Sequence, residues 1–419
     1  MKKLMLVFLF FSLFIKSNAE TKRVLFIGNS YIYTNNLPQV LKDVALSNGD
    51  DLIFDSSAPG GHTFLQHTTN ATTLAKIQQG NWDYIILQEQ SQRPAFPISQ
   101  VETEVFPYAA YLDSISKAQN TCATVLYYMT WGRKNGDASN CQFYPPLCTY
   151  GGMDSLLRLR YQMMADENSS ELSPVGAVWK NIRINNPTVE LYVADESHPN
   201  PTGTYAAAVC FYSSIFRKSP LNVTYNFSVS AENASIIKSA VYDVVFQNFQ
   251  QWNIGNFDPH SAFEFSGGLA SGEFVFSNLS EYSNEYIWDF GDGTEISTEE
   301  SPSHVFAEQG NYYVKLISKK CGRSDTLIQN LNYFILSGIS NLYDEEPKFF
   351  PNPGNGIIEI IGTSDFGKLI VTTMDGRTIK EINSMSKNIK IDLSENKSGI
   401  YFVSFIGRNG NKTYRYLKV

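Results

Sequence analysis

The first half of the chain alternates strand-like apolar runs with segments of helical spacing, and this alternation limits the possible folds more than any other feature. The runs are "RVLFIG", "DDLIFDSS", "WDYIILQ", "ATVLYYMTW" and "VELYVADE". The segment after the first run places apolar residues on one helical face, namely Leu37, Val40, Leu41, Val44 and Ala45. Strands joined by covering helices form a parallel sheet, and such sheets bind ligands at the carboxyl ends of their strands. The sequence therefore predicts an α/β domain with its site at that edge.

Ser30 follows the first apolar run in the stretch "VLFIGNSYIYTNNLP". It lies just past the carboxyl end of a predicted strand. Gly, Asn and Ser are also ordinary turn and helix-capping residues, so this stretch taken alone favours a turn. A dinucleotide site is weaker still, because "IGNSYIYT" lacks the further glycines that let the backbone approach a pyrophosphate. A nucleophilic role for Ser30 therefore needs a base elsewhere in the chain.

Histidines are scarce, which shortens the search for that base. The five are His62, His67, His198, His260 and His304. His198 lies in "VADESHPNPTGTYAAAVCFY", directly after the last predicted strand, and Asp195 precedes it by three residues. Taken alone, Asp-x-x-His fits a loop with a helix cap. Combined with Ser30, it predicts a nucleophile, a base and an orienting acid at one sheet edge.

These stretches resemble the motif blocks of the SGNH (GDSL-like) hydrolases, a superfamily of esterases and carbohydrate esterases with a flavodoxin-like three-layer fold. "FIGNSYIYTN" resembles the nucleophile block, with Asn29 where many members have aspartate, and "DESHP" resembles the final block. The resemblance implies a catalytic triad of Ser30, Asp195 and His198. "APGGHTFLQH" resembles the block that supplies a glycine N–H, which implies that Gly61 joins the Ser30 N–H in the oxyanion hole.

The middle block departs from the family pattern, because "ILQEQSQRP" stands where the family has Gly-x-Asn. A glutamine can present the same amide N–H donor as an asparagine. "QEQS" is similar to the Gln-Gly-Glu of sialate O-acetylesterase-like members, and Gln88 comes first after the apolar run. We therefore expect Gln88 to complete the oxyanion hole, with Gln90 as the second choice and Gln92 also available.

An aromatic segment, "MTWGRKNGDASNCQFYPPLCTYGGM", begins at the end of the fourth predicted strand. It is typical of a lid or a substrate rim. Trp131, with Tyr144 and Tyr150, is expected to stack on a sugar ring, and Arg133, with Lys134, to meet a carboxylate or hydroxyls. Ordinary loop packing explains the segment equally well. No metal ligand set and no cofactor are expected.

The second half of the chain has short strands and turns, which are typical of β-sandwiches. "YIWDFGDGTEISTEESPSHVFAEQGNYYVKLIS" resembles the immunoglobulin-like PKD domain, over residues 259–337. "FFPNPGNGIIEI" and the stretch ending "SGIYFVSFIGRNGNKTYRYLKV" resemble the sorting domain of type IX secretion substrates of Bacteroidetes, over residues 344–419. The resemblance implies the type IX secretion machinery as a partner. The α/β domain is assigned to residues 20–255.

Residues 1–19 read as a secretory signal peptide, with two lysines, an apolar run and a small-x-small cleavage site. No later stretch is long enough to span a membrane, so a secreted or cell-surface protein is expected. The net charge of −8 disfavours a nucleic-acid partner. Cys141 and Cys148 are close enough for a local bridge, whereas Cys122 and Cys210 are expected to be core thiols and Cys321 stands alone.

The combined prediction is a secreted serine ester hydrolase, most simply a carbohydrate acetyl esterase. Its substrate is expected to be an ester, an acylated carbohydrate above all. A non-catalytic surface protein that binds carbohydrate or serves adhesion is the alternative from another class. The acyl group, the alcohol, the oligomeric state and calcium binding by the PKD domain do not follow from the sequence.

Overall fold

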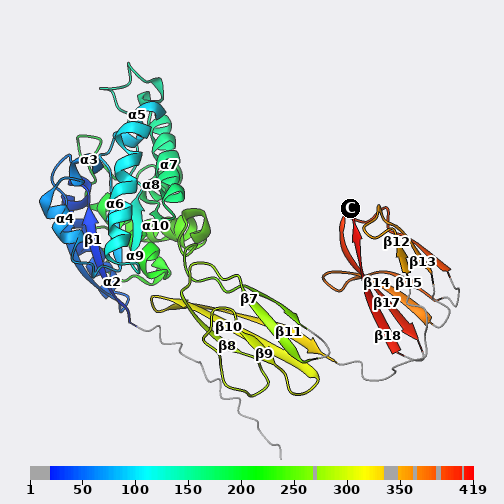
Figure 1. Ribbon diagram of the computed structural model, residues 1–419. Helices are drawn as coiled ribbons and strands as arrows, with labels where there is room; N and C mark the ends of the chain where they lie inside the picture. Colours follow the sequence, from blue (N-terminus) through cyan, green and yellow to red (C-terminus); the bar gives the residue numbers. More distant parts are fainter. Residues whose placement is uncertain (1–18, 268–270, 335–347, 362–365, 384–387, 408–409) are drawn as a thin grey trace, which may run out of the picture.

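The computed structural model describes residues 19–267, 271–334, 348–361, 366–383, 388–407 and 410–419 (Figure 1). The predicted signal peptide, residues 1–19, falls almost entirely outside the described residues. Three separate hydrophobic cores are present: one from Val24 to Ile254, one from Phe263 to Tyr333 and one from Ile358 to Tyr416. We refer to the parts built on these cores as the first, second and third domains.

The first domain contains one sheet of five parallel strands in the order β2-β1-β3-β4-β5. The strands are β1 (Thr21–Ile27), β2 (Asp51–Ser57), β3 (Tyr84–Leu87), β4 (Thr124–Tyr128) and β5 (Glu171–Ser173). Ile27 pairs with Leu87 and Leu87 pairs with Tyr127, so the central strands end at one level. The loops that follow them therefore meet at one edge of the sheet.

Helices cover both faces of this sheet. Phe26 of β1 packs edge-on against Phe211 of α9 (Pro201–Phe216), with ring centroids 6.2 Å apart. Tyr127 of β4 points to the opposite face, where its hydroxyl donates to the carbonyl oxygen of Ala109 in α6 (Phe106–Gln119) at 3.3 Å. The helices are α1 (Ser30–Tyr33), α2 (Leu37–Leu46), α3 (Phe64–His67), α4 (Ala71–Ile77), α5 (Ile98–Glu104), α6 (Phe106–Gln119), α7 (Tyr150–Glu167), α8 (Val175–Asn185), α9 (Pro201–Phe216) and α10 (Ala231–Val241). The predicted three-layer α/β architecture is confirmed.

The amphipathic helix expected after the first strand is α2, and its apolar face is buried as predicted. The fifth strand differs from the prediction, because β5 is the short run Glu171–Ser173 and the stretch 189–196 does not join the sheet. That stretch folds back on itself instead: Tyr192 bridges to Pro199, and the Asn200 N–H donates to the Leu191 carbonyl at 2.9 Å. Its end nevertheless lies at the carboxyl edge of the sheet, next to Ser30.

The second domain has two antiparallel three-stranded sheets, ordered β6-β7-β9 and β11-β10-β8. The strands are β6 (Phe263–Gly267), β7 (Glu273–Asn278), β8 (Glu285–Asp289), β9 (Ser303–Val305), β10 (Gly310–Lys320) and β11 (Arg323–Tyr333). Trp288 is fully buried between the sheets and meets Phe263 edge-on at 5.0 Å. Asp289 pairs with Lys315 at 2.8 Å, and Asp292 pairs with His304 at 2.7 Å.

The third domain has a three-stranded sheet, β12-β13-β16, and a four-stranded sheet, β15-β14-β17-β18. The strands are β12 (Lys348–Phe350), β13 (Ile357–Ile361), β14 (Phe366–Thr373), β15 (Thr378–Ile382), β16 (Asn388–Asp392), β17 (Gly399–Gly407) and β18 (Gly410–Lys418). Both later domains are therefore all-β, as the sequence predicts. Among the residues described in all three domains, no helix has the length and apolar character that a membrane crossing requires.

A disulfide between Cys122 and Cys321 joins the first domain to the second. The expectation that Cys122 is a core thiol is therefore wrong, because Cys122 lies in an exposed turn before β4 and faces the β10–β11 hairpin. Cys210 is buried and free, as expected. Asp258 adds an ionic link near the disulfide, since it pairs with Arg217 of the first domain and Arg323 of the second.

Candidate active site

Ser30 is the first residue of α1 and ends the nucleophile loop, which we define as residues 28–30. Asn29 caps the helix, because its side-chain oxygen accepts an N–H of the first turn at 3.3 Å. Gly28 has no space for a side chain, since a Cβ there would overlap Gln88. The loop thus packs closely against the end of β3 and holds Ser30 at the carboxyl edge of the sheet.

The structure brings Ser30, His198 and Asp195 into one hydrogen-bonded chain. His198 Nε2 lies 2.8 Å from Ser30 Oγ, and His198 Nδ1 lies 2.5 Å from Asp195 Oδ2. Asp195 Oδ1 accepts the backbone N–H groups of Ser197 and His198, both at 2.9 Å. Glu196, in the same turn, has a φ of 61°. Such a left-handed residue is costly, and the hydrogen bonds of the turn hold it in place.

The hydrogen positions in this chain follow from the partners. A carboxylate only accepts, so Nδ1 of the neutral imidazole carries its hydrogen toward Asp195 and Nε2 is free to accept from Ser30. Burial acts to raise the pKa of Asp195, but the N–H groups of Ser197 and His198 that bond to its carboxylate outweigh burial and hold the pKa below its usual value. This arrangement can accept the hydroxyl proton and stabilise the imidazolium that results.

Trp131 supports the site from within and does not line its surface. The side chain is fully buried, and its ring stacks on Tyr31 at 4.7 Å and on Trp179 at 3.6 Å. Its Nε1–H donates to the carbonyl oxygen of Ser197 at 3.1 Å. The prediction that Trp131 stacks on a substrate sugar is wrong, because its ring packs against other side chains. It holds the loop that carries His198.

Gly61 lies in the glycine loop, which we define as residues 58–63. Gly61 is exposed and has a φ of 69°, which glycine adopts without strain. The Asn29 side-chain amide donates to a carbonyl oxygen of this loop at 3.0 Å. The loop ends in a capping box, in which Thr63 and Gln66 bond to each other's backbone N–H. Gly61 is therefore held beside the nucleophile loop.

Gln88 begins the glutamine loop, which we define as residues 88–93. Its side chain is fully buried, and its oxygen accepts the backbone N–H of Asn29 at 2.9 Å. Its amide nitrogen bonds to the carbonyl oxygen of Glu89. The buried carboxamide bonds to the backbone through both its oxygen and its nitrogen. This contradicts the prediction that Gln88 is the side-chain donor of the oxyanion hole. Gln88 instead ties the end of β3 to the nucleophile loop.

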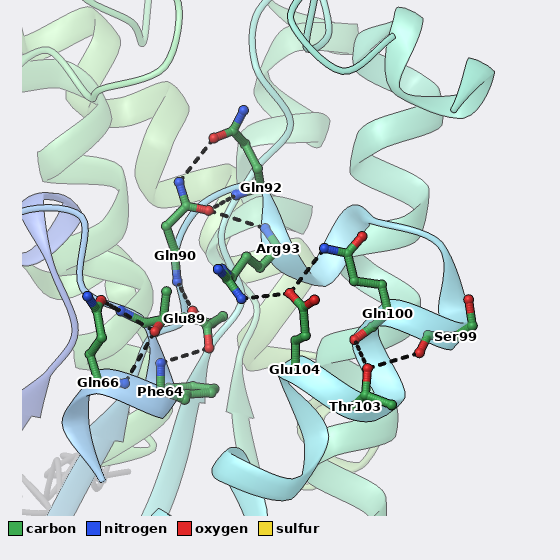
Figure 2. Close-up of polar contacts among 11 residues, drawn as sticks. Phe64, Gln66, Glu89, Gln90, Gln92, Arg93, Ser99, Gln100, Thr103 and Glu104 are labelled. Carbon is green, nitrogen blue, oxygen red and sulfur yellow. Dashed lines mark hydrogen bonds and ion pairs between the residues drawn. The ribbon is translucent and has the colours of Figure 1, made fainter. Parts of the chain in front are cut away.

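Gln90 is half-buried, and its carboxamide is held by its own loop (Figure 2). Its oxygen accepts the N–H of Gln92 at 2.9 Å and that of Arg93 at 3.3 Å, and its nitrogen donates to the Gln92 side-chain oxygen at 3.0 Å. An amide nitrogen carries two hydrogens, and this contact uses one of them. Gln92 in turn donates to Asp137 at 2.6 Å, so its side chain is directed to the aromatic segment, and Gln90 is retained as the candidate donor.

Two buried titratable residues that the sequence reasoning missed lie next to these loops. Glu89 is fully buried, and burial raises its pKa to about 7 against the opposing N–H groups of Phe64 and Gln90. His67 is also fully buried, and burial lowers its pKa to about 4, so its ring is neutral at neutral pH. His67 Nε2 donates to the Gly28 carbonyl at 2.8 Å. The available signal for Glu89 was a charged residue near the end of an entirely apolar strand.

Arg133 lies in the aromatic segment and pairs with Asp137 at 3.4 Å, with its side chain 27% exposed. Asp137 is fully buried and also accepts the side-chain amide of Asn140 at 2.6 Å. The predicted bridge between Cys141 and Cys148 is present in this segment. Arg133 therefore remains a candidate for substrate contact from a well-braced loop. Within the described ranges, no three His, Cys, Asp or Glu side chains are grouped so that they could hold a metal ion.

Two segments of the chain match family models. Residues 269–332 match the PKD domain, and residues 348–418 match the secretion system C-terminal sorting domain. No curated protein matches the chain in sequence. The matched segments coincide with the two all-β domains.

Several solved structures resemble parts of the chain. A DUF4886 family protein from Bacteroides uniformis is 16% identical and covers 53% of this chain and 94% of its own, with a TM-score of 0.47. A lipase/acylhydrolase from Enterococcus faecalis is 11% identical over 46% of this chain and 95% of its own, with a TM-score of 0.35. The PKD1 domain of the Vibrio cholerae metalloprotease PrtV is 31% identical over 18% of this chain and 95% of its own, with a TM-score of 0.17.

The parallel five-stranded sheet, ordered β2-β1-β3-β4-β5 with helices on both faces, is a flavodoxin-like three-layer α/β fold. The chain joins this fold to a PKD domain and to a C-terminal type IX sorting domain, which indicates export to the cell surface or secretion.

Proposed function

We propose that the first domain is a serine ester hydrolase. The observation that carries the proposal is the hydrogen-bonded chain from Ser30 Oγ through His198 to Asp195, with contacts of 2.8 and 2.5 Å. A nucleophile, a base and an orienting acid in this order are the parts that acyl transfer from an ester requires.

In the proposed first step, Ser30 Oγ forms a bond to the acyl carbon while His198 Nε2 takes the hydroxyl proton. Asp195 stabilises the imidazolium. The bond to the alcohol then breaks, and the alcohol leaves with the proton from His198. In the second step a water gives a proton to His198 and attacks the acyl carbon. The acid is released, and the proton returns to Ser30.

The negative charge that develops on the carbonyl oxygen needs hydrogen-bond donors that already point at it. We assign the backbone N–H groups of Ser30 and Gly61 and the side-chain amide of Gln90 to this role. Gln90 replaces Gln88 in the assignment because Gln88 is fully buried with its carboxamide bonded to Asn29 and Glu89, whereas Gln90 is only half-buried.

The proposed substrate is an acyl ester of a carbohydrate, with acetyl as the simplest group. The site is open, since the side chains of His198 and Asp195 are 35% and 48% exposed. An open site accommodates an acyl group that projects from a large molecule, and export brings the protein to polymers outside the cell. We assign Arg133, at the rim, to contact with polar groups of the sugar.

The test measures hydrolysis of p-nitrophenyl acetate and release of acetate from acetylated glycans by the full-length protein. Ser30→Ala is expected to reduce both rates to background, and an organophosphonate is expected to label the parent on Ser30. Ser99→Ala is the matched control, because Ser99 is exposed on α5, and it should match the parent.

Parent activity that persists in a folded Ser30→Ala protein would show that Ser30 is not the nucleophile. An inactive, unlabelled parent that still binds acylated glycans would favour the non-catalytic alternative. Activity on p-nitrophenyl acetate without release of acetate from any glycan would support the proposed ester hydrolase and refute the proposed carbohydrate substrate.

A further inference from the structure

The three loops around Ser30 are tied to one another in pairs. The side-chain amide of Asn29, in the nucleophile loop, donates to the backbone carbonyl oxygen of His62, in the glycine loop, at 3.0 Å. Gln88 of the glutamine loop accepts the Asn29 N–H at 2.9 Å. The third pair, the glycine loop and the glutamine loop, is tied by the carboxylate of Glu89.

Glu89 reaches both of those loops with its two oxygens (Figure 2). Oε2 accepts the N–H of Phe64, directly after the glycine loop, at 2.9 Å. Oε1 accepts the N–H of Gln90, in the glutamine loop, at 2.6 Å. The carboxylate therefore lies between the segment that carries Gly61 and the residue that we assign as the side-chain donor.

The surroundings of Glu89 show that packing alone does not explain it. The residue is fully buried, and its carboxylate accepts hydrogen bonds from the backbone N–H groups of Phe64 and Gln90. The neighbouring cation, Arg93, is paired with Glu104 at 2.8 Å. A buried carboxylate without a paired cation is costly, whereas an apolar residue would fill the space without that cost.

The chemistry of the contact explains the choice of glutamate. Two N–H groups converge on one side chain, and above pH 7, where the carboxyl is ionised, it has two acceptor oxygens and no donor hydrogen. Glutamine has one acceptor oxygen, and its amide hydrogens would face the second N–H group. Hydrogen bonds from N–H to a carboxylate are also shorter and stronger than neutral ones.

We propose that Glu89 is a positioning residue that fixes the distance between the glycine loop and the glutamine loop, and so places the Gly61 N–H and the Gln90 amide for the oxyanion. The proposal rests on the proposed function. Short connections transmit the constraint: Thr63 and Gln66 rigidify the segment around Phe64, and the Gln90 N–H bonds to Glu89 directly. Small displacements of reacting or stabilising groups are costly in rate.

The experiment compares Glu89→Gln with the parent in the full-length protein at a pH above 7, where Glu89 is ionised, with p-nitrophenyl acetate as substrate. We expect kcat to fall about 10- to 100-fold, less than the roughly 100- to 1000-fold loss for complete removal of one oxyanion donor. KM should stay within about twofold, because the oxyanion donors act mainly in the transition state. A general loss of structure would not produce that split.

Glu104→Gln is the matched control, because it makes the same chemical change in the same region. Glu104 pairs with Arg93 and Gln100, and its side chain is 42% exposed. Its kcat should equal that of the parent. A folded Glu89→Gln protein with parental kcat would overturn the proposal.

Amide hydrogen exchange in the parent gives a second readout that does not depend on a variant that folds. The N–H groups of Phe64 and Gln90 should be strongly protected, more than that of the exposed Gly61. Fast exchange of either bonded N–H would also overturn the proposal. The two proposals can fail separately. Activity in a folded Ser30→Ala protein would refute the role of Ser30 as nucleophile. An active parent whose Glu89→Gln variant has the same kcat would refute only the positioning role of Glu89.

Discussion

Replacement of Glu89 by glutamine should change how the free energy of unfolding depends on pH. Burial raises the pKa of Glu89 from 4.5 to about 7 in the folded protein, against the N–H groups of Phe64 and Gln90 and the charge of Arg93. The folded state therefore holds this proton more tightly than the unfolded state. The stabilisation is complete below the unfolded pKa and is lost as the pH rises to 7. A difference of this size corresponds to about 3 kcal/mol.

His67 has the opposite effect over an overlapping pH range. Burial lowers its pKa from 6.5 to about 4, although its bond to Gly28 works against this. Its stabilisation is complete above the unfolded pKa and is lost as the pH falls through 4, again by about 3 kcal/mol. Between roughly pH 4.5 and 6.5 the contributions of Glu89 and His67 cancel in the parent. In Glu89→Gln only the His67 contribution remains, so this variant should lose stability as the pH falls.

Urea unfolding at several pH values measures the free energy of unfolding of the parent and of Glu89→Gln, with tryptophan fluorescence as the signal. Four of the five tryptophans belong to the first domain, so the signal reports mainly on that domain. The difference between Glu89→Gln and the parent should change by about 3 kcal/mol from pH 4.5 to 7.5, and other titrating groups cancel in it. Glu104→Gln should give a flat difference. A flat difference for Glu89→Gln would refute the argument, because the folded state would then not hold the extra proton.

Four further predictions test the site and the domain junction. Gln90→Ala should lower kcat roughly 100- to 1000-fold with little change in KM, as expected for an oxyanion donor, and steady-state kinetics on p-nitrophenyl acetate decide this. Gln88→Ala should lower the urea midpoint as well as kcat, because it leaves a buried N–H unpaired; an unchanged midpoint would contradict its structural role. The double substitution Cys122→Ser and Cys321→Ser removes a disulfide that spans a sequence separation of 199 residues. Thermal unfolding should then show that the free energy of unfolding falls by as much as about 5 kcal/mol. A chain that ends at Gly255 should keep esterase activity and lose stability, and a folded but inactive product would show that the second domain helps to form the site.

The sequence predicted which side chains come together at the carboxyl ends of the strands. Ser30 follows β1 directly, and His198 with Asp195 reached the same edge although their stretch is not a strand of the sheet. This placement was predictable because helix α9 begins at Pro201 and packs on the sheet. The loop before its first residue therefore lies at the carboxyl edge. β5 was missed because three residues are too few to show periodicity.

Side-chain direction is the part that the sequence does not encode locally. Trp131 follows a strand and precedes a loop, a position that fits both a rim and a core residue, and only its stacking on Tyr31 and Trp179 decides between them. Gln88 and Gln90 lie two positions apart in one loop, yet the Gln88 side chain is fully buried and the Gln90 side chain is half-buried. The Cys122–Cys321 pairing depends on how two domains dock, which no spacing reveals.

The two edges of the parallel sheet have different tasks. The carboxyl edge carries the three loops around Ser30, whereas the second domain attaches at the amino edge (Figure 1). Cys122 lies just before β4, and Tyr84, the first residue of β3, accepts a hydrogen bond from Arg323 at 3.1 Å. Because the attachment uses the edge opposite the candidate site, the PKD domain can be fixed rigidly without covering Ser30. That separation suits an exported protein whose proposed substrate is part of a large molecule.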